Sequence, residues 1–355
     1  MQDRYTGELW VLGDVAYTTT WGNRDTFGNA VKIWDVSGNV PSLIDSLIVP
    51  NAVTLGDVQA SDDGQLLVVA TEFSPGSIML YSLADPRKPQ LIARYATALT
   101  DPGVHTADVT RVNGRLYAFL SVDIGSSGSA RLVIVDITDP ANATQVFTQA
   151  MGSPYTHDVF VRDGILFIAV WNDGIKIWDI GGGGRGGTPS NPVELSTLVT
   201  VGGEAHNIWW YKNATTGEKR FAFVGQEGPG AVGKFASGDI HIVDVSNLSA
   251  PREVAFFHIS GAGTHNFWVD ENRGILYAAY YNGGVRAIDV TGDLGTCDPA
   301  NHDLIGRCNL SAMGREIGHG LLDGPPVYIW GVQLAGGQLY ASDMLNGIWK
   351  LAPLP

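Results

Sequence analysis

The sequence predicts an all-β protein, a single seven-bladed β-propeller of four-stranded antiparallel blades that spans residues 1–355. Two observations predict this fold. An apolar phrase that ends in aspartate recurs along the chain, and each copy belongs to a unit of about 50 residues with four short β-rich segments. Amphipathic stretches of helical length are nearly absent. A two-layer sandwich would not generate seven copies of one motif, so a ring of blades is the better prediction.

The composition agrees with an all-β chain and excludes several classes of protein. Glycine accounts for 45 residues without a collagen period, and 45% of the chain is hydrophobic, which excludes collagen and disorder. Only 16% of the residues are charged, so little of the surface is charged helix. The formal net charge of −14 argues against nucleic acid as a partner, because phosphate binding requires clustered lysine and arginine.

The recurring phrase is expected to form the third strand of each blade. Its copies occupy residues 31–37, 132–140, 175–182, 240–251 and 285–293, with a variant at 78–86 and a shortened copy at 347–353. An aspartate at the end of a strand commonly accepts hydrogen bonds from the backbone of the following turn. We therefore expect a structural role for the five aspartates of the phrase: Asp35, Asp136, Asp179, Asp244 and Asp289.

The other three strands of a unit surround this phrase. In the unit that begins at His157, the first strand is HDVFVRDG, the second is ILFIAVWNDG and the fourth is VELSTLVTV. The last unit ends at Pro355, just after its third strand, and the first unit opens with its innermost strand at Glu8. The seventh blade is therefore expected either to be incomplete or to be closed by a short strand from residues 1–7.

Two copies of the phrase carry a resemblance to a known family. LVIVDITDP (132–140) and IHIVDVSNLSAP (240–251) resemble the LVIVD-repeat family of bacterial β-propellers. The resemblance covers essentially the whole chain. It implies the propeller fold and a protein that is exported or attached to the cell surface, and it gives little guidance on activity.

Histidine begins the first strand of four consecutive units. His105, His157, His206 and His265 follow one another at spacings of 52, 49 and 59 residues. Since first strands line the central channel, these side chains are expected to converge at one mouth of it. Neutral imidazoles suit a transition metal ion such as Fe, Cu or Zn. Two alternatives stay open: structural histidines that bond to a neighbouring blade, and acid–base chemistry without a metal.

Several turns between second and third strands point toward the same mouth and carry polar residues. They are Glu72, Asp123, Asn172, Asp173, Glu227, Asn282 and Asp343. We expect Glu72 and Glu227 to be the catalytic residues, either orienting the histidines or acting as acid–base groups. The arrangement is similar in fold and ligand type to carotenoid-cleaving oxygenases and to the selenium-binding, methanethiol-oxidising propellers. No motif of either family is present.

The largest insertion spans about residues 291–328 and is expected between blades six and seven. Cys297 and Cys308 lie within it, and two lone cysteines in one loop suggest a disulfide, with two reduced thiols as the alternative. A pinned flap that leads into an inner strand would cover the histidines as a lid, and a decorated surface loop is the other interpretation. A disulfide would place the protein in a secreted, periplasmic or cell-surface location, although Met1 begins no signal peptide.

These features favour a metal-dependent enzyme, with oxidation favoured slightly over hydrolysis, that acts on a small or apolar substrate. The competing hypothesis is a non-catalytic surface propeller that binds protein or glycan through its loops. No nucleotide cofactor is expected, because the glycine-rich stretches at 181–189 and 225–238 do not join a strand to a helix. No apolar run is long enough for a membrane helix.

Overall fold

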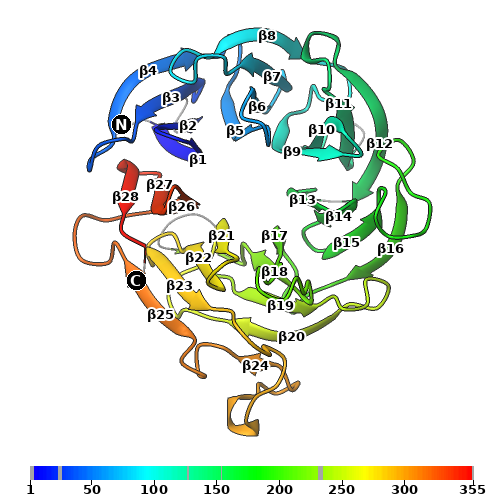
Figure 1. The fold of residues 1–355 in the computed structure, drawn as a ribbon, viewed down its shortest axis with the longest axis vertical. Helices are drawn as coiled ribbons and strands as arrows, with labels where there is room; N and C mark the ends of the chain where they lie inside the picture. The colour runs from blue at the N-terminus through cyan, green and yellow to red at the C-terminus, as the bar shows by residue number, and fades with distance from the viewer. Residues whose placement is uncertain (1–3, 23–25, 126–127, 153, 231–234, 354–355) are drawn as a thin grey trace.

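Seven small sheets stand around a central axis in the computed structural model, which describes residues 4–22, 26–125, 128–152, 154–230 and 235–353 (Figure 1). The sheets follow one another in chain order, and strands within each blade pair antiparallel in the order of the sequence. The predicted seven-bladed propeller is therefore confirmed. The innermost strands β1, β5, β9, β13, β17, β21 and β26 face the axis.

The first four blades each contain four strands. Blade one contains β1 (Arg4–Leu12), β2 (Val15–Gly22), β3 (Ala30–Asp35) and β4 (Ser42–Ile48). Blade two contains β5 (Thr54–Ala60), β6 (Leu66–Glu72), β7 (Ser77–Ser82) and β8 (Gln90–Tyr95). Blade three contains β9 (Val104–Val112), β10 (Arg115–Val122), β11 (Ala130–Asp136) and β12 (Thr144–Gly152), with the short 3-10 helix η1 (Pro140–Asn142) before its last strand. Blade four contains β13 (Asp158–Arg162), β14 (Ile165–Ala169), β15 (Ile175–Asp179) and β16 (Val193–Leu198).

The last three blades differ in size. Blade five contains β17 (Ala205–Trp210), β18 (Phe221–Gln226), β19 (Ile240–Asp244) and β20 (Arg252–Phe257), to which the insertion adds β24 (Cys308–Asn309). Blade six contains β21 (Phe267–Asp270), β22 (Ile275–Ala279), β23 (Val285–Asp289) and β25 (Glu316–Gly320), and the 3-10 helix η3 (Pro299–Asn301) precedes β24. Blade seven contains only β26 (Ile329–Ala335), β27 (Gln338–Asp343) and β28 (Gly347–Leu351).

Burial follows the position of each strand in its blade. Every residue of β6, β14, β18 and β22 is buried, because neighbouring blades cover both faces of a second strand. Burial alternates along β13, so that one face packs in the core and the other lines the channel. The outer strand β4 is largely exposed. The apolar runs of the sequence are thus the second and third strands of a layered ring.

Tight turns connect the first and second strands. Asn113 and Gly114 have φ values of 49° and 82°, and Asp163 and Gly164 repeat this pattern at 49° and 71°. Two successive residues with positive φ are what a type I′ hairpin turn requires, and the Asn-Gly and Asp-Gly pairs adopt it at low cost. These turns fix the register of the inner strand that carries the channel-lining side chains.

The aspartates of the recurring phrase have the structural role that the sequence predicts. Each of the five accepts a hydrogen bond from the backbone N–H two residues further on. Asp179 goes further, because its carboxylate also accepts bonds from the backbone of Gly182, Gly183, Arg185 and Gly187. The glycine-rich stretch at 181–189 therefore encloses a buried carboxylate.

Blade seven is three-stranded, so the ring is closed by side chains and by packing between blades seven and one. The amide of Gln333 in β26 accepts a hydrogen bond from the Val11 nitrogen at 2.6 Å and donates one to the Val11 carbonyl at 3.2 Å. The Thr6 nitrogen donates to the Met344 carbonyl. Of the two expected closures the incomplete blade is the one that the described residues show, since β1 already begins at Arg4 as the inner strand of blade one; residues 1–3 lie outside the described part of the chain.

The insertion lies on the outer rim of the ring and interrupts blade six, rather than separating blades six and seven. Residues 316–320 form the fourth strand of blade six, β25, which pairs with β23. Before it, β24 pairs in parallel with β20 of blade five, and Figure 1 shows this segment projecting from the periphery. The expectation of a lid over the histidines is therefore wrong. It assumed that the insertion led directly into an inner strand, whereas the chain first completes blade six.

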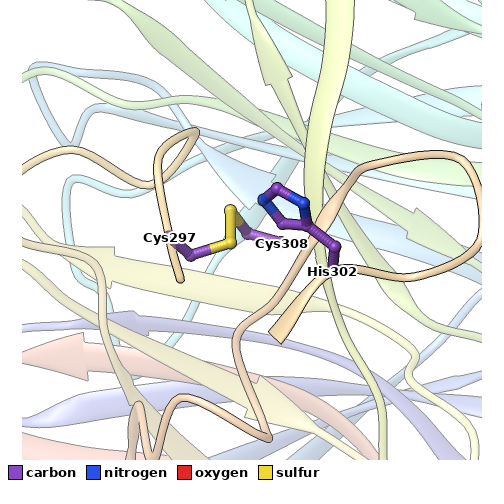
Figure 2. Close-up of side chains that lie close together, drawn as sticks. All are labelled: Cys297, His302 and Cys308. Carbon is purple, nitrogen blue, oxygen red and sulfur yellow. A yellow bond between two sulfur atoms is a disulfide. The ribbon is translucent and has the colours of Figure 1, made fainter. Parts of the chain in front are cut away.

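The predicted disulfide joins Cys297 to Cys308 and anchors the insertion beside its short strand (Figure 2). Arg307 adds an ion pair to Glu253 of blade five and another to Asp303 within the insertion. These contacts make the insertion an ordered extension of the rim. None of the helices in the described residues has the length and hydrophobicity of a membrane span.

Candidate metal centre

The structure brings the four predicted histidines together on the axis. His105 lies in β9 and His206 in β17, while His157 directly precedes β13 and His265 lies just before β21. The ring centroids of successive histidines are 4.1, 3.9 and 4.2 Å apart. One residue position, repeated in blades three to six, therefore forms a continuous arc of imidazoles.

The Nε2 atoms of these rings converge on one carboxylate. Nε2 of His105 and Nε2 of His157 are 2.9 Å apart. Glu227 Oε2 lies 3.9 Å from Nε2 of His157 and 3.6 Å from Nε2 of His206, and Glu227 Oε1 lies 4.0 Å from Nε2 of His265. Ligand atoms bound at about 2.0–2.2 Å to one ion lie roughly 3–3.5 Å from each other. The ligand atoms of His157, His206 and Glu227 all lie within 4.8 Å of one another, whereas His105 groups with Glu72 and Asp123, and His265 approaches the first group at Glu227.

Outer contacts orient two of the rings with Nε2 directed inward. Glu72 Oε1 lies 3.0 Å from Nδ1 of His105, and its other oxygen accepts a hydrogen bond from Trp21 Nε1 at 3.1 Å. Nδ1 of His265 donates to the Trp330 carbonyl at 2.6 Å. A carboxylate or a carbonyl on Nδ1 is the usual partner of a metal-binding histidine, because it fixes the tautomer that leaves Nε2 unprotonated.

Two histidines in the centre of the arc have nitrogen atoms without partners. Among the described residues, Nδ1 of His157 and both ring nitrogens of His206 have no hydrogen-bond partner. His206 is 1% exposed and His157 is 8% exposed. Burial of an unpaired polar atom is costly, and such atoms in a native structure commonly mark a bound ion or water. A cation bound at Nε2 of His206 would remove the cost for that nitrogen, while the two Nδ1 atoms would stay outside the metal bond.

The electrostatics divide the arc into one charged and three neutral rings. Burial lowers the pKa of His157 and His206 well below the ordinary value, reinforced by the neighbouring imidazoles, and lowers that of His265 to about 3. Burial also lowers the pKa of His105, but the neighbouring Glu72 carboxylate has the larger opposite effect and raises the pKa of His105 to about 10. Three rings are therefore in the form that binds metals, and His105 would release a proton on binding one.

Glu227 is a buried acid at the centre of the site. Burial raises its pKa to about 7, although the Tyr281 hydroxyl donates a hydrogen bond to Oε1 at 2.5 Å. Tyr281 itself is buried, and burial raises its pKa well above the ordinary value. Glu227 can therefore exchange a proton near neutral pH, whereas Tyr281 remains a donor.

Only some of the polar residues predicted at the second-to-third-strand turns reach the site. Glu72, Asp123 and Glu227 line the cavity around the histidines, and Asp123 belongs with Glu72 and His105 to a second cluster of possible ligand atoms. Asp343 instead accepts hydrogen bonds from Trp349 and from the Tyr328 backbone. Asn172 and Asp173 are exposed, Asn282 is half-buried, and none of the three lines the cavity.

The sequence interpretation missed three aromatic residues of the site. Trp21, Trp171 and Tyr281 stand at the ends of the second strands of blades one, four and six. Glu72 and Glu227 occupy the same place in blades two and five. Alignment of the seven second strands could have found the aromatic residues, because their end position is the one that faces the axis.

The cavity around the histidines has a volume of about 520 Å³ and opens at a partly apolar mouth. Phe73, Ile124 and Tyr155 at this mouth are 48%, 38% and 44% exposed. A second cavity of about 300 Å³ continues along the axis on the other side of the histidines and shares Glu8 and Asp158 with the first. The site is thus open to small molecules from one face of the ring.

A further cluster of possible ligands on the rim does not offer a comparable site. Cys297, His302 and Cys308 lie close together, but the two sulfur atoms are bonded to each other (Figure 2). A disulfide supplies no thiolate ligand. The axial histidines are therefore the stronger candidate.

Comparison with known proteins identifies the repeat. A family model described as the LVIVD repeat matches residues 127–149, 154–200 and 235–258. These three segments are similar to the LVIVD repeat. They contain β11, the whole of blade four, β19 and β20, and of the four histidines they include only His157. The match therefore covers parts of blades three to five and leaves the arc of histidines unassigned.

Solved structures support the fold alone. Sqt1 from Saccharomyces cerevisiae is similar with a TM-score of 0.60 and 9% identity, covering 98% of this chain and 82% of the Sqt1 chain. No curated protein matches the sequence. The functional argument therefore rests on the site itself.

Proposed function

We propose that the protein is an exported, metal-dependent enzyme that holds a transition metal ion in its axial channel. His105, His157, His206 and His265 are the ligands, and Fe, Cu and Zn are the ions that four imidazoles suit. The observation that carries the proposal is His206, whose two ring nitrogens are buried without partners among the described residues and whose Nε2 lies 3.6 Å from Glu227. A structural histidine would be bonded to a neighbouring blade instead.

The residues around the ligands have distinct roles in this proposal. Glu72 and the Trp330 carbonyl orient His105 and His265 through their Nδ1 atoms. Glu227, with its pKa raised to about 7 by burial, accepts or returns a proton at the oxygen that faces the histidines. Tyr281 fixes the other oxygen of Glu227 by a hydrogen bond.

The reaction favoured is oxidation of a small apolar substrate, with hydrolysis as the second choice. A bound redox-active ion would pass the electrons of the substrate to an external oxidant such as dioxygen, and the channel residues would bind the substrate and exclude water. The partly apolar mouth at Phe73, Ile124 and Tyr155 supports an apolar substrate, which more often offers oxidisable bonds than hydrolysable ones. The Cys297–Cys308 disulfide supports an oxidising location, hence a secreted, periplasmic or cell-surface protein.

Elemental analysis of the purified protein tests the metal site. We expect about one equivalent of Fe, Cu or Zn per chain, lost in His206→Ala and retained in the control His319→Ala. His319 is a suitable control because it lies on β25 of the rim and its side chain is 53% exposed. Stripping with a chelator followed by reloading should restore the content of the wild type and of His319→Ala, but not of His206→Ala.

A metal content far below one per chain, unchanged by His206→Ala, would contradict the proposal. That result, together with normal folding of His206→Ala, would favour the competing function of a non-catalytic propeller that binds protein or glycan through its loops. Reloading with each of the three ions in turn identifies the ion that binds most tightly.

A further inference from the structure

The charges around the cavity restrict what can enter it. Five carboxylates line the cavity, contributed by Glu8, Glu72, Asp123, Asp158 and Glu227, and none of the described residues that line it is lysine or arginine. An anionic ligand would be repelled by these acids, and the one cationic side chain of the lining, His105, is already paired with Glu72 at 3.0 Å. Carboxylates and phosphates are therefore poor ligands for this site.

The same carboxylates, apart from Asp123, are also poor partners for an organic cation, because Glu8, Glu72, Asp158 and Glu227 already accept hydrogen bonds. Glu72 accepts hydrogen bonds from His105 and Trp21. Glu227 accepts one from Tyr281, and Glu8 accepts from the Leu9 nitrogen and from Asn266. The metal ion of the proposed function would add positive charge at the centre of this group. An uncharged ligand is repelled neither by the carboxylates of the lining nor by a bound metal ion.

Aromatic side chains form the wall between this centre and the mouth. Trp171 stacks on His157 with an angle of 28° between the rings and 5.5 Å between their centroids. Tyr155 meets Trp171 nearly edge-on at 5.4 Å, and Phe73 stands across the cavity from blade two. Tyr155 and Phe73 are 44% and 48% exposed, so their rings are available for contact.

Two of these aromatic residues are held in an unfavourable backbone conformation. Phe73 and Trp171 have φ values of 62° and 44°, in the left-handed region that bulky residues rarely adopt. Glycine would relieve this strain, yet both positions carry large rings directed at the cavity. Strain of this kind tends to persist at ligand-binding positions.

We propose that the substrate is an uncharged small molecule with a planar aromatic or conjugated face, bound between Trp171, Tyr155 and Phe73 with its reacting end toward the histidines. This inference rests on the proposed function for the reaction, but the binding step needs only the aromatic wall and the acidic lining. The cavity volume of about 520 Å³ lies within the ordinary range of small-molecule pockets.

Isothermal titration with three matched naphthalene probes tests the inference. The probes share one ring system and differ in charge: 2-naphthalenemethanol is neutral, 2-naphthoate is an anion and 2-naphthylmethylammonium is a cation. We expect the neutral probe to bind at least about tenfold more tightly than either charged probe, a difference that one uncompensated charge readily supplies. Tighter binding of the anion or of the cation would overturn the inference.

Variants locate the binding and separate it from folding. Phe73→Gly and Trp171→Gly each remove a ring and relieve the positive φ, so their folding should be preserved while affinity for the neutral probe falls by about tenfold. Leu304→Ala is the control, because Leu304 is fully exposed on the insertion at the rim. Unchanged affinity in both glycine variants would contradict the assignment of the binding wall.

Wild-type protein stripped of metal by a chelator distinguishes failure of this inference from failure of the proposed function. The neutral probe should still prefer the cavity of the stripped protein, since Trp171, Tyr155 and Phe73 are intact. If the wild type holds no metal but binds the neutral probe selectively, the inference stands and the proposed chemistry fails. If metal is bound but the three probes bind alike, the inference fails and the metal centre stands.

Discussion

Two residue positions recur from blade to blade in this propeller, and they differ in how well their polar atoms are satisfied. The aspartates at the ends of the third strands are all bonded to their own turns, and Asp179 accepts bonds from five backbone nitrogens. The histidines at the starts of the first strands include two rings with buried nitrogens that lack partners among the described residues. Repetition is common to both positions, so it does not by itself indicate function. The buried nitrogen atoms without hydrogen-bond partners distinguish the histidine position from the aspartate position.

The largest expected effects come from a crossed pair of substitutions, His206→Ala and Asp179→Ala. Loss of Asp179 leaves five backbone donors without an acceptor and should lower the free energy of unfolding by about 3 kcal/mol, with the metal content unchanged. Loss of His206 should abolish metal binding, while the unfolding free energy of the metal-free protein changes by less than about 1 kcal/mol. Urea denaturation and elemental analysis measure the two quantities.

The distinction between structural aspartates and functional histidines fails if His206→Ala lowers stability and Asp179→Ala lowers the metal content. Severe destabilisation of the metal-free form by His206→Ala would assign the histidines a structural role. Both variants must be compared without metal, because a bound ion stabilises the folded state by mass action.

The pH dependence of stability sharpens the account of Asp179. Its burial favours a raised pKa, but the backbone donors of the glycine-rich turn outweigh burial and lower the pKa to about 2. Because the folded pKa is lower than the ordinary value of 3.8, the contribution of the carboxylate is complete above about pH 4 and is lost as the pH falls toward 2. The difference in unfolding free energy between wild type and Asp179→Asn should therefore shrink between pH 5 and pH 2.5. A constant difference would show that the charge is not involved.

A smaller effect is expected from the outer contacts of the metal centre. Tyr281→Phe removes the hydroxyl that holds Glu227 and should weaken metal affinity by about tenfold, the lower range for such contacts. Tyr280→Phe is the matched control, since Tyr280 is equally buried and its hydroxyl lies near the Phe257 carbonyl, away from the histidines. Competition with a chromophoric chelator measures both affinities. Equal affinities in the two variants would remove Tyr281 from the site.

The smallest effect on the centre is expected from the disulfide. Replacing Cys297 and Cys308 by serine opens a loop whose closure contributes at most about 3 kcal/mol to stability. Metal content and affinity for the neutral probe should not change, because β24 lies on the rim beside β20. A change in either quantity in this double variant would revive the lid that the structure contradicts.

The blades could be predicted from sequence because their determinants are local. Alternation along β13, continuous apolar residues in β14 and the Asp-Gly turn between them are visible in 12 residues, 158–169. The histidines could be grouped because the repeat converts equal positions in the sequence into neighbouring positions in space. Whether they bind a metal stays a prediction.

The remaining features depend on long-range packing. Tyr280 and Tyr281 are neighbouring residues of the same type, so the sequence does not distinguish them. In the fold the two side chains point in different directions, and only the hydroxyl of Tyr281 donates a hydrogen bond to Glu227. The insertion carries no periodic signal that could assign residues 316–320 to blade six or β24 to blade five. These strands pair with whichever strand has an unpaired outer edge in the folded ring, which is β23 for β25 and β20 for β24.

The closure of the ring also determines where the molecule can open. Blades seven and one are joined by Gln333 and Val11 and by Lys350 and Val36, whereas the four histidines belong to blades three to six. An ion held there would restrain the motion of those four blades and leave the joint between blades seven and one free to separate. Amide hydrogen exchange would then slow in the liganded arc and stay fast at the joint, so that one part of the ring is rigid and the other breathes.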